Sequence, residues 1–395
     1  MDFSKLKPAR DVAIIGIGST EFGEHWNKSL RELAGEAGSK ALHDANINPE
    51  EIQLLVGGNM SGGMFVGQEH GSGLFADYLG INPTPSMRTE AACASGSVAA
   101  RVGFMAVASG MYDVVAVGGA EKMTDVPGDT ATSVLAGAMD QENEAFHGLT
   151  FPSVYAFLAN RHMFDYGTTR EQIAMIPVKN HKNGHLNPIA HFKSKITVED
   201  VMNSALVADP LRLLDCSPIS DGAASIIMVP ADKAKDYDDD PIYIRASAQA
   251  SDSLTVHDRR DMTTLDATVW AAKEAYQRAG LSPKDINIAE VHDCFSINEL
   301  IAYEDLGFAK KGEGGKLIES GEVEIGGKIP INTSGGLKAK GHPVGATGIA
   351  QLYELVEQLR GKAGKRQVEN ARYGLAHNVG GSGATVVVHI LSNER

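Results

Sequence analysis

The chain repeats one pattern of expected elements at a long offset, and this repetition limits the folds that it can adopt. The turn 46–52 leads from an expected helix over 29–45 into a strand, and the turn 280–286 leads from an expected helix over 265–279 into another. Each half alternates apolar strands with helices, which is typical of α/β units with helices on both faces of a sheet. We therefore expect a duplicated domain whose equivalent turns face one crevice at the strand ends.

The length of 395 residues exceeds one ordinary hydrophobic core, which agrees with two halves. We expect residues 1–118 together with 222–235 to form the N-terminal half, with a strand over 224–229 completing it. Residues 119–221 do not repeat and are expected to form an inserted loop domain. Residues 236–395 are expected to form the C-terminal half.

Composition and local patterns exclude several classes of protein. A net charge of −14 argues against general nucleic-acid binding. The motif Gly16-x-Gly18 follows a strand, but Glu21 stands where a dinucleotide fingerprint needs glycine, and no helix opens there. The stretch 179–195 contains no acidic residue, and it is interpreted either as a site for a phosphorylated ligand or as a solvated loop.

We also expect a cytoplasmic protein that does not enter a membrane. Residues Met1 to Arg10 are polar and mixed in charge, unlike a signal peptide, and no apolar run reaches a membrane-spanning length. The end of the chain carries no peroxisomal address. Cysteines are sparse and odd in number (Cys93, Cys216 and Cys294), which indicates a reducing compartment.

Cys93 is the first candidate for a reacting side chain. It follows a short expected strand and precedes the almost uncharged segment 98–109, which predicts a buried helix. Free N–H groups and the positive end of the dipole at such a helix start favour the thiolate, which is the nucleophilic form. The alternative for Cys93 alone is a buried, inert cysteine.

Further polar residues stand at the ends of other expected strands and turns. His342 lies in the glycine-rich turn 341–348, the counterpart of the Cys93 turn, and a histidine within reach could activate the cysteine. The strand 288–291 runs into His292-Asp293-Cys294-Phe295, where polar residues at a buried strand end point to function. The segment 376–383 contains His377, Gly380 and Gly381, and its exposed backbone N–H groups could form an oxyanion hole. No CxxC spacing is present, so we expect no metal site.

These motifs resemble those of the thiolase family along essentially the whole chain. The resemblance rests on Glu90-Ala91-Ala92-Cys93-Ala94-Ser95-Gly96, Val117-Gly118-Gly119-Ala120-Glu121 and Gly341-His342-Pro343-Val344-Gly345-Ala346-Thr347-Gly348. It implies duplicated βαβαβαββ halves in a five-layer αβαβα arrangement, a homodimer or homotetramer, and acyl-CoA substrates. It implies no cofactor, because coenzyme A is part of the substrate and of the product. Within the family, Cys93 would be acylated, His342 would activate it, and the backbone N–H groups of Cys93 and Val379 would form the oxyanion hole.

One departure from the biosynthetic thiolases with two catalytic cysteines locates the acid/base thiol. Those enzymes carry Asn-Glu-Ala-Phe where this chain has His292-Asp293-Cys294-Phe295, and a second cysteine where this chain has His377. The thiol is therefore expected at Cys294, as in sterol-carrier-protein-type thiolases and archaeal acetoacetyl-CoA thiolases. The segment 147–152 is similar to the archaeal group, in which His147 would lie near the acyl pocket. Phe295, His377, Gly380 and Gly381 are the other expected substrate-binding residues.

The resemblance implies an acetyl-CoA C-acetyltransferase that makes acetoacetyl-CoA through acetyl-Cys93. Cys294 would remove a proton from C2 of the second acetyl-CoA, and His292 and His342 would stabilise the enolate oxygen. The product would feed hydroxymethylglutaryl-CoA synthase and the mevalonate pathway, in a possible complex with that synthase and a small bridging protein. The alternatives are thiolysis of longer 3-ketoacyl-CoAs and a subunit that only binds acyl-CoA. A hydroxymethylglutaryl-CoA synthase would need a glutamate where this chain has Cys294.

Overall fold

A computed structural model describes residues 8–395, so most of the polar start of the chain lies outside the described residues. The strands are β1 (Val12–Ser19), β2 (Leu54–Gly58), β3 (Ser86–Thr89), β4 (Val115–Glu121), β5 (Leu206–Ala208), β6 (Leu211–Arg212), β7 (Gly222–Pro230), β8 (Ile242–Ser251), β9 (Ile288–Glu290), β10 (Tyr373–Gly380) and β11 (Thr385–Ser392). The helices are α1 (Leu30–Asp44), α2 (Gly62–Val66), α3 (Gly71–Tyr78), α4 (Ser95–Ala108), α5 (Gly128–Ala136), α6 (Phe151–Tyr166), α7 (Arg170–Gly184), α8 (Val198–Asn203), α9 (Asp266–Ala279), α10 (Ser296–Asp305), α11 (Gly314–Glu319), α12 (Gly336–Ala339) and α13 (Thr347–Leu359).

The order of the strands shows the expected duplication. The main sheet runs β3-β2-β4-β7-β1-β8-β11-β10-β9, so the second half repeats the first half in mirror order about the β1–β8 pair. Within each half the inner pairs are antiparallel and the outer pairs are parallel. Val12 to Ile14 pair with Ile242 to Ile244, which joins the two halves in one hydrogen-bonded sheet.

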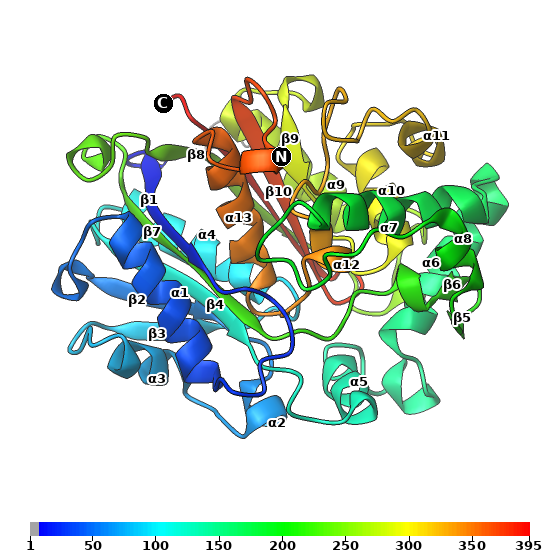
Figure 1. Cartoon of the computed structure of the whole chain (residues 1–395), viewed down its shortest axis with the longest axis horizontal. Coiled ribbons are helices and arrows are strands. Elements are labelled where there is room, and N and C mark those ends of the chain that lie inside the picture. Colours follow the sequence, from blue (N-terminus) through cyan, green and yellow to red (C-terminus); the bar gives the residue numbers. More distant parts are fainter. Residues whose placement is uncertain (1–7) are drawn as a thin grey trace.

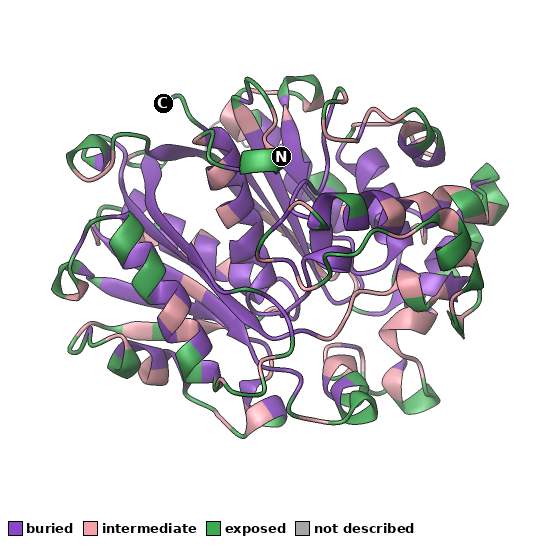
Figure 2. Cartoon of the chain, viewed as in Figure 1, coloured by how far each residue is buried: buried purple, intermediate pink, exposed green. Residues whose placement is uncertain are grey.

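Three layers of helices enclose the two halves of this sheet, as the five-layer expectation requires (Figure 1). One core packs α1 and α3 on the first half, and another packs α9 and α10 on the second half. The core between them unites α4 and α13 with strands of both halves. Figure 2 shows the inner strands of the main sheet buried, while the outward side of α1 is exposed. The fold therefore brings α4 and α13, and the turns before them, to the centre of the molecule.

The start of α4 can approach α13 closely because its first turn contains a glycine. A Cβ on Gly96 would lie 2.7 Å from the carbonyl oxygen of Gly345, a distance that real side chains do not adopt. Gly16 and Gly18 have a similar explanation, because a Cβ on either would lie within 2.3 Å of a carbonyl oxygen of α1. Helix packing, and not a dinucleotide, accounts for the Gly16-x-Gly18 pattern.

The second half lacks a full counterpart of β3. At the matching place, residues 330–333, only Ile331 forms a bridge, with Ala289. The next residue, Asn332, has φ +57°, which ends an extended strand. Its side chain instead accepts a hydrogen bond from the backbone N–H of Val291 at 2.8 Å. This asparagine therefore supports the end of β9, where the His292 segment begins.

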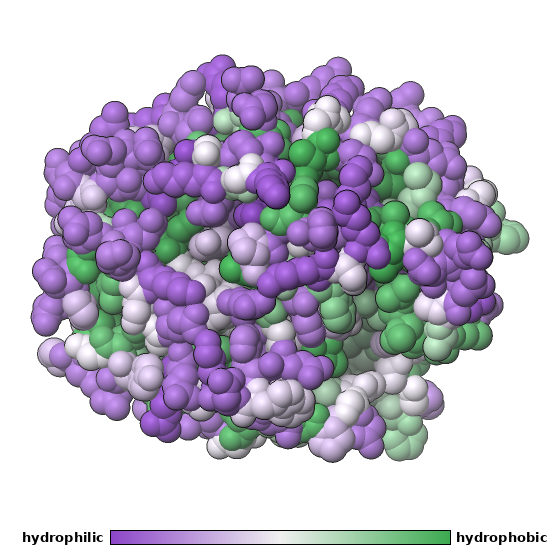
Figure 3. Space-filling model, in the orientation of Figure 1, coloured by the Kyte–Doolittle hydropathy of each residue, from purple (hydrophilic) through white to green (hydrophobic). Residues whose placement is uncertain are grey.

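The expected loop domain contains α5 to α8 and the β5–β6 hairpin, and it packs beside the C-terminal half (Figure 1). β4 continues to Glu121, which lies opposite Gly222 on β7. The face in Figure 3 is mostly hydrophilic, with hydrophobic residues scattered among the hydrophilic ones. Among residues 8–395, no helix combines the length and the apolar character needed to cross a membrane.

Candidate active site

Cys93 lies in a fixed turn, two residues before α4 begins at Ser95. Ala92 has φ +51°, a conformation that L-residues adopt only when their surroundings hold it. The Ser95 hydroxyl donates to the carbonyl oxygen of Ala92 at 2.6 Å and accepts from the N–H of Ala91 at 2.9 Å. These bonds close the turn and direct the buried Cys93 side chain away from the sheet edge toward the centre of the fold.

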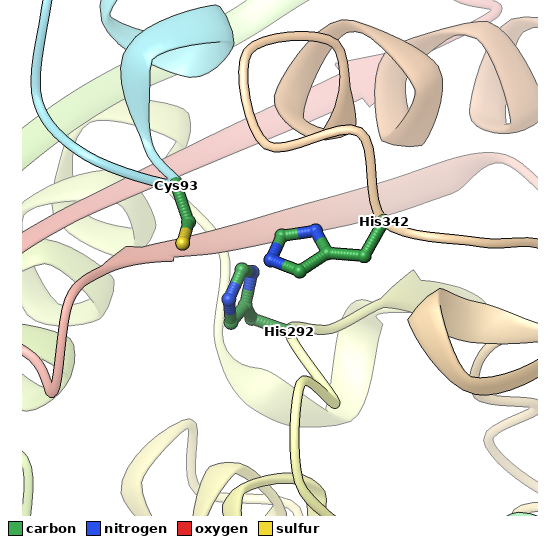
Figure 4. A group of neighbouring side chains, drawn as sticks. All are labelled: Cys93, His292 and His342. Atoms are coloured by element: carbon green, nitrogen blue, oxygen red, sulfur yellow. The ribbon is translucent and has the colours of Figure 1, made fainter. Parts of the chain in front are cut away.

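Two histidines from the other half meet Cys93, as the duplicated turns predicted. His292 follows β9, and His342 lies in the turn before α13. The three side chains point toward one another from separate segments (Figure 4), and one ligand atom of each lies within 4.8 Å of the others. The two imidazole rings are 5.1 Å apart and nearly perpendicular, at 81°. This set of atoms could carry out nucleophilic chemistry and could also hold a thiophilic metal ion.

The protonation states differ from the sequence-based expectation of a thiolate at the start of a helix. Burial raises the pKa of the Cys93 thiol to about 12, and the nearby carboxylate of Glu121 acts in the same direction. Burial also lowers the pKa of His342 to about 3. Burial thus opposes both the thiolate and an ion pair between Cys93 and His342, because the cost of burying charge outweighs the helix dipole. Cys93 and His342 rest as a neutral thiol and a neutral imidazole.

A backbone amide after β10 lies at the sulfur of Cys93. The N–H of Gly381 donates to Sγ, which partly offsets the rise of the Cys93 pKa. Gly381 has φ +61° and lies in the turn between β10 and β11. Val379, from which this amide was expected, lies inside β10 opposite Val386. The role of the Val379 amide stays a prediction, and Gly381 is the better-placed donor.

A second thiol shares the site. Cys294 is buried, and burial raises the pKa of its thiol far above the usual range, with the proximity of Cys93 adding to the rise. Tyr155 of α6 is fully buried, and its hydroxyl interacts with the Cys294 thiol. The same hydroxyl donates to the carbonyl oxygen of Gly381 at 3.1 Å. Tyr155 thus connects the second thiol to the turn that supplies the amide at Cys93.

These groups face a mostly apolar cavity of about 210 Å³, which opens beside the loop domain. Its walls come from three of the four catalytic candidates, Cys93, Cys294 and His342, and from Gly381 and Phe295. The other walls are side chains of the loop domain and of the turn before α13: Met123, Thr132, Leu135, Phe151, Pro152, Tyr155, Val207, Leu213, Cys216, Ser217, Pro218, Ile219 and Val344. All three cysteines of the chain border it. A cavity of this kind suits an acyl group and the arm that carries it.

The structure brings some expected substrate-binding residues to this cavity and leaves others outside. Phe295 lines it and stacks on Tyr155 with ring centroids 4.6 Å apart. Gly380 borders an open hollow on the other side of the Gly381 turn. His147 is exposed and does not line the cavity at Cys93. His377 is buried away from it, with its Nε2 3.0 Å from the hydroxyl of Thr268 on α9.

Two residues that the sequence analysis missed contact the histidines. Asn378, and not His377, reaches the site, because successive side chains of β10 point to opposite faces. The amide nitrogen of Asn378 lies 3.0 Å from Nδ1 of His292. The hydroxyl of Thr347 lies 2.7 Å from Nδ1 of His342. Strand alternation could have indicated Asn378, and Thr347 lies inside the 341–348 motif.

A buried polar network holds the 292–295 segment. Asp293 accepts from the backbone N–H of Leu337 at 2.6 Å and from the Asn180 amide at 2.7 Å. The ammonium group of Lys338 donates to the carbonyl oxygen of Cys294 at 3.1 Å. Burial, together with the negative charge of Glu299, raises the pKa of Asp293 to about 6. This network fixes the backbone on both sides of the Cys294 thiol.

The stretch 179–195 is partly helix and partly a loop that is exposed over residues 192–195. Its first part belongs to α7, where Lys179 is buried and lies 2.8 Å from the carboxylate of Glu299. Two exposed lysines, Lys182 and Lys193, pair with Glu324 and Glu21. These three lysines therefore meet carboxylates from distant parts of the chain, and a phosphorylated ligand at this stretch stays a prediction.

Comparisons with known proteins agree with this geometry. Residues 12–232 match the family model "Thiolase, N-terminal domain", and residues 248–393 match "Thiolase C-terminal domain-like". An acetyl-CoA acetyltransferase of Methanothermobacter thermautotrophicus is 59% identical over 97% of this chain and 100% of its own length. One from Methanocaldococcus jannaschii is 53% identical over 98% and 100%. Sterol carrier protein 2 of Bos taurus is 37% identical over 95% of this chain and 71% of its own length.

Solved structures show the same fold. A chain described as "Ltp2-ChsH2(DUF35) aldolase" has a TM-score of 0.86 and 28% identity, with 98% of this chain and 99% of that chain covered. The acetyl-CoA acetyltransferase of Syntrophomonas wolfei has a TM-score of 0.76 at 18% identity, with coverage of 98% and 100%. With family models over both halves and relatives that match nearly end to end, the chain is an enzyme of the thiolase family.

Proposed function

We propose that the protein is an acetyl-CoA C-acetyltransferase that converts two acetyl-CoA into acetoacetyl-CoA and coenzyme A. The observation that carries this proposal is that one apolar cavity holds two thiols, Cys93 and Cys294, with His342 beside Cys93. A condensation of two thioesters needs one nucleophile to hold the first acyl group and one base for the second. The high identity to two archaeal acetyl-CoA acetyltransferases supports the same substrate.

In the first step, Sγ of Cys93 attacks the carbonyl carbon of acetyl-CoA while its proton moves to His342. This transfer accompanies the attack, because both partners rest neutral. The backbone N–H groups of Cys93 and Gly381 act on the sulfur and are placed to hold the oxygen of the tetrahedral intermediate. The C–S bond to coenzyme A breaks, and the departing thiolate takes the proton of Cys294. Acetyl-Cys93, an imidazolium at His342 and a thiolate at Cys294 remain.

In the second step, the Cys294 thiolate takes a proton from C2 of a second acetyl-CoA. His292 and the protonated His342 hydrogen bond to the resulting enolate oxygen, which stabilises the charge in a buried site. The enolate carbon attacks the carbonyl of acetyl-Cys93, and the C–S bond breaks to release acetoacetyl-CoA. The sulfur of Cys93 recovers its proton from His342, so all groups return to their starting states.

The proposal is tested by incubating the purified chain with acetyl-CoA and measuring the protein mass and the products. We expect an acetyl adduct on Cys93 and formation of acetoacetyl-CoA. An adduct without product would indicate a subunit that only takes up the acyl group. The reverse reaction with 3-ketoacyl-CoAs of increasing length measures the chain-length range, and a preference for long chains would overturn the short-chain assignment.

We further propose that the enzyme is a cytoplasmic homo-oligomer that supplies hydroxymethylglutaryl-CoA synthase in the mevalonate pathway. β3 supports self-association, since it lies at the edge of the sheet and its Met87 side chain is 42% exposed. A complex with the synthase and a small bridging protein would pass acetoacetyl-CoA directly to its consumer. Sedimentation of the purified chain measures the oligomer, and co-purification from the native host tests the complex. A chain that always elutes without partners would contradict the complex.

A further inference from the structure

We infer that Thr347 and Asn378 are positioning residues that fix opposite tautomers of His342 and His292. One ring then offers a bare nitrogen to the site and the other offers an N–H group. The tautomers follow from hydrogen bonds to two neutral rings, while the use made of the two nitrogens rests on the proposed function. Both rings are neutral, because burial lowers the pKa of His342 to about 3 and that of His292 well below its usual value.

The tautomer of His342 follows from where the Thr347 proton goes. The Thr347 hydroxyl donates to the carbonyl oxygen of Pro343 at 3.0 Å. Its oxygen must therefore accept the second contact, from Nδ1 of His342 at 2.7 Å. A neutral imidazole carries one N–H, so Nε2 of His342 is bare. This buried Nε2 has no hydrogen-bond partner among residues 8–395, and its lone pair is available to Cys93.

The tautomer of His292 is the opposite one. The nitrogen Nδ2 of Asn378 lies 3.0 Å from Nδ1 of His292, and an amide nitrogen can only donate. Nδ1 therefore accepts, and Nε2 of His292 carries the proton. This Nε2 is also buried without a partner in the described part of the chain. It can donate to a substrate oxygen, but it cannot take the proton of a thiol.

The two positioning residues divide the work between the rings. The bare Nε2 of His342 can accept the Cys93 proton. The N–H group of His292 can donate to the substrate oxygen as negative charge develops on it. If both rings had the same tautomer, the site would lack either its base or its donor. Asn378 and Thr347 themselves touch neither the thiol nor the cavity surface.

The same tautomers also control metal binding. Cys93, His292 and His342 form a set of possible zinc ligands, but a ring nitrogen binds a metal only when it is bare. Asn378 keeps the proton on Nε2 of His292, so this nitrogen cannot bind a metal ion. An aspartate at position 378 would instead accept from Nδ1–H and free Nε2, which is the arrangement around metal-binding histidines. The amide thus protects a cluster of thiol and imidazole groups from thiophilic metals.

¹⁵N NMR of histidine-labelled full-length protein tests the inference, because bare and protonated ring nitrogens have clearly different shifts. We expect protonated Nε2 in His292 and protonated Nδ1 in His342. Asn378→Asp should move the His292 proton to Nδ1, and Thr347→Val should remove the bias at His342 while Thr347→Ser retains it. Thr268→Val is the matched control, since it removes a hydroxyl from a third buried histidine, His377.

The same tautomer in both wild-type rings, or no change at His292 in Asn378→Asp, would overturn the inference. These outcomes do not depend on turnover, so a failure of the proposed reaction would be recognised separately.

Metal titration is the second measurement. Side chains that hydrogen bond to a metal-ligating histidine change metal affinity by about 10–100-fold, so Asn378→Asp should bind Zn²⁺ more tightly than wild type by that factor. Co²⁺ should give a thiolate charge-transfer band in Asn378→Asp that is lost when Cys93→Ala is added. Equal Zn²⁺ affinity in wild type and Asn378→Asp, with both folded by thermal melting, would contradict the protective role of Asn378.

Discussion

The hydroxyl of Tyr155 donates a hydrogen bond to the carbonyl oxygen of Gly381, 3.1 Å away. The same hydroxyl interacts with Cys294, so it links the proposed acid/base thiol to the turn at the nucleophile. Tyr155→Phe keeps the ring that stacks on Phe295 and removes only this link. We expect condensation to slow about fivefold, since one such hydrogen bond contributes about 1 kcal/mol.

The rate constants for acetylation and for condensation, measured separately, test this prediction. Tyr276→Phe is the control, because it removes a buried hydroxyl that donates to the Leu306 carbonyl, outside the cavity. Equal rates in Tyr155→Phe and wild type would show that the link has no part in the reaction.

The two thiols should separate by reaction step. Cys93→Ala should neither trap an acetyl group nor make acetoacetyl-CoA, because the nucleophile is gone. Cys294→Ala should still trap an acetyl group, since coenzyme A can leave as a thiolate, yet it should fail to remove the C2 proton. Protein mass and condensation rate are measured on both, with Cys216→Ala as a control for loss of a third thiol at the cavity. Condensation at the wild-type rate in Cys294→Ala would place the base elsewhere.

Alkylation of Cys93 should report a neutral resting thiol. Because its pKa is raised to about 12, the thiolate fraction rises about tenfold for each pH unit between pH 7 and pH 10. The rate of modification by iodoacetamide, followed by mass spectrometry of the Cys93 peptide, should therefore climb throughout this range. A plateau below pH 9 would mean that the thiolate is already formed and that the ion pair exists.

The two histidines on neighbouring strands should respond very differently to substitution. His292→Ala removes a proposed donor to the enolate oxygen, and loss of one such donor lowers kcat by about 10²–10³-fold. His377→Gln should leave condensation intact, because this side chain is turned toward Thr268. Steady-state kinetics of both variants check this contrast. A large loss of condensation rate in His377→Gln, with an unchanged melting temperature, would make His377 a candidate proton carrier.

Stability should depend on the buried ion pair under the 292–295 segment. Lys179→Ala leaves the Glu299 carboxylate buried without its cation, and such losses cost about 3–5 kcal/mol of unfolding free energy. Lys182→Ala breaks a pair on the same helix whose lysine is 59% exposed, so about 1 kcal/mol or less is expected. Urea unfolding measures both variants. Similar losses in the two would show that burial does not decide the strength of these pairs.

Features set by local chemistry could be predicted from the sequence. The helix expected over 29–45 is α1, Leu30–Asp44, because Ser29 and Glu32 form a capping box at its start. The meeting of Cys93 with His342 followed from the repeat, since equivalent turns of two halves face each other. The family was likewise identified by its motifs.

Features that depend on burial and side-chain direction could not be predicted in this way. The neutral state of Cys93 depends on the desolvation of its sulfur, which no local pattern reveals. Tyr155 lies on α6 in the loop domain. Nothing in the sequence of this helix indicates that it reaches Cys294. Strand alternation shows that only one of His377 and Asn378 can face the site, because adjacent strand residues face opposite ways. Choosing between them requires knowing which face of the strand is turned toward Cys93.

The contact between Gly96 and Gly345 has a consequence for the origin of such an enzyme. Cys93 belongs to one repeat and His342 to the other, and these residues meet only where α4 and α13 pack together. A gene encoding a single repeat would supply half of the reacting groups and an uncovered central helix. It could perform this chemistry only by pairing with a second copy of itself. In one chain the two turns can differ, so one carries the cysteine and the other carries the histidine.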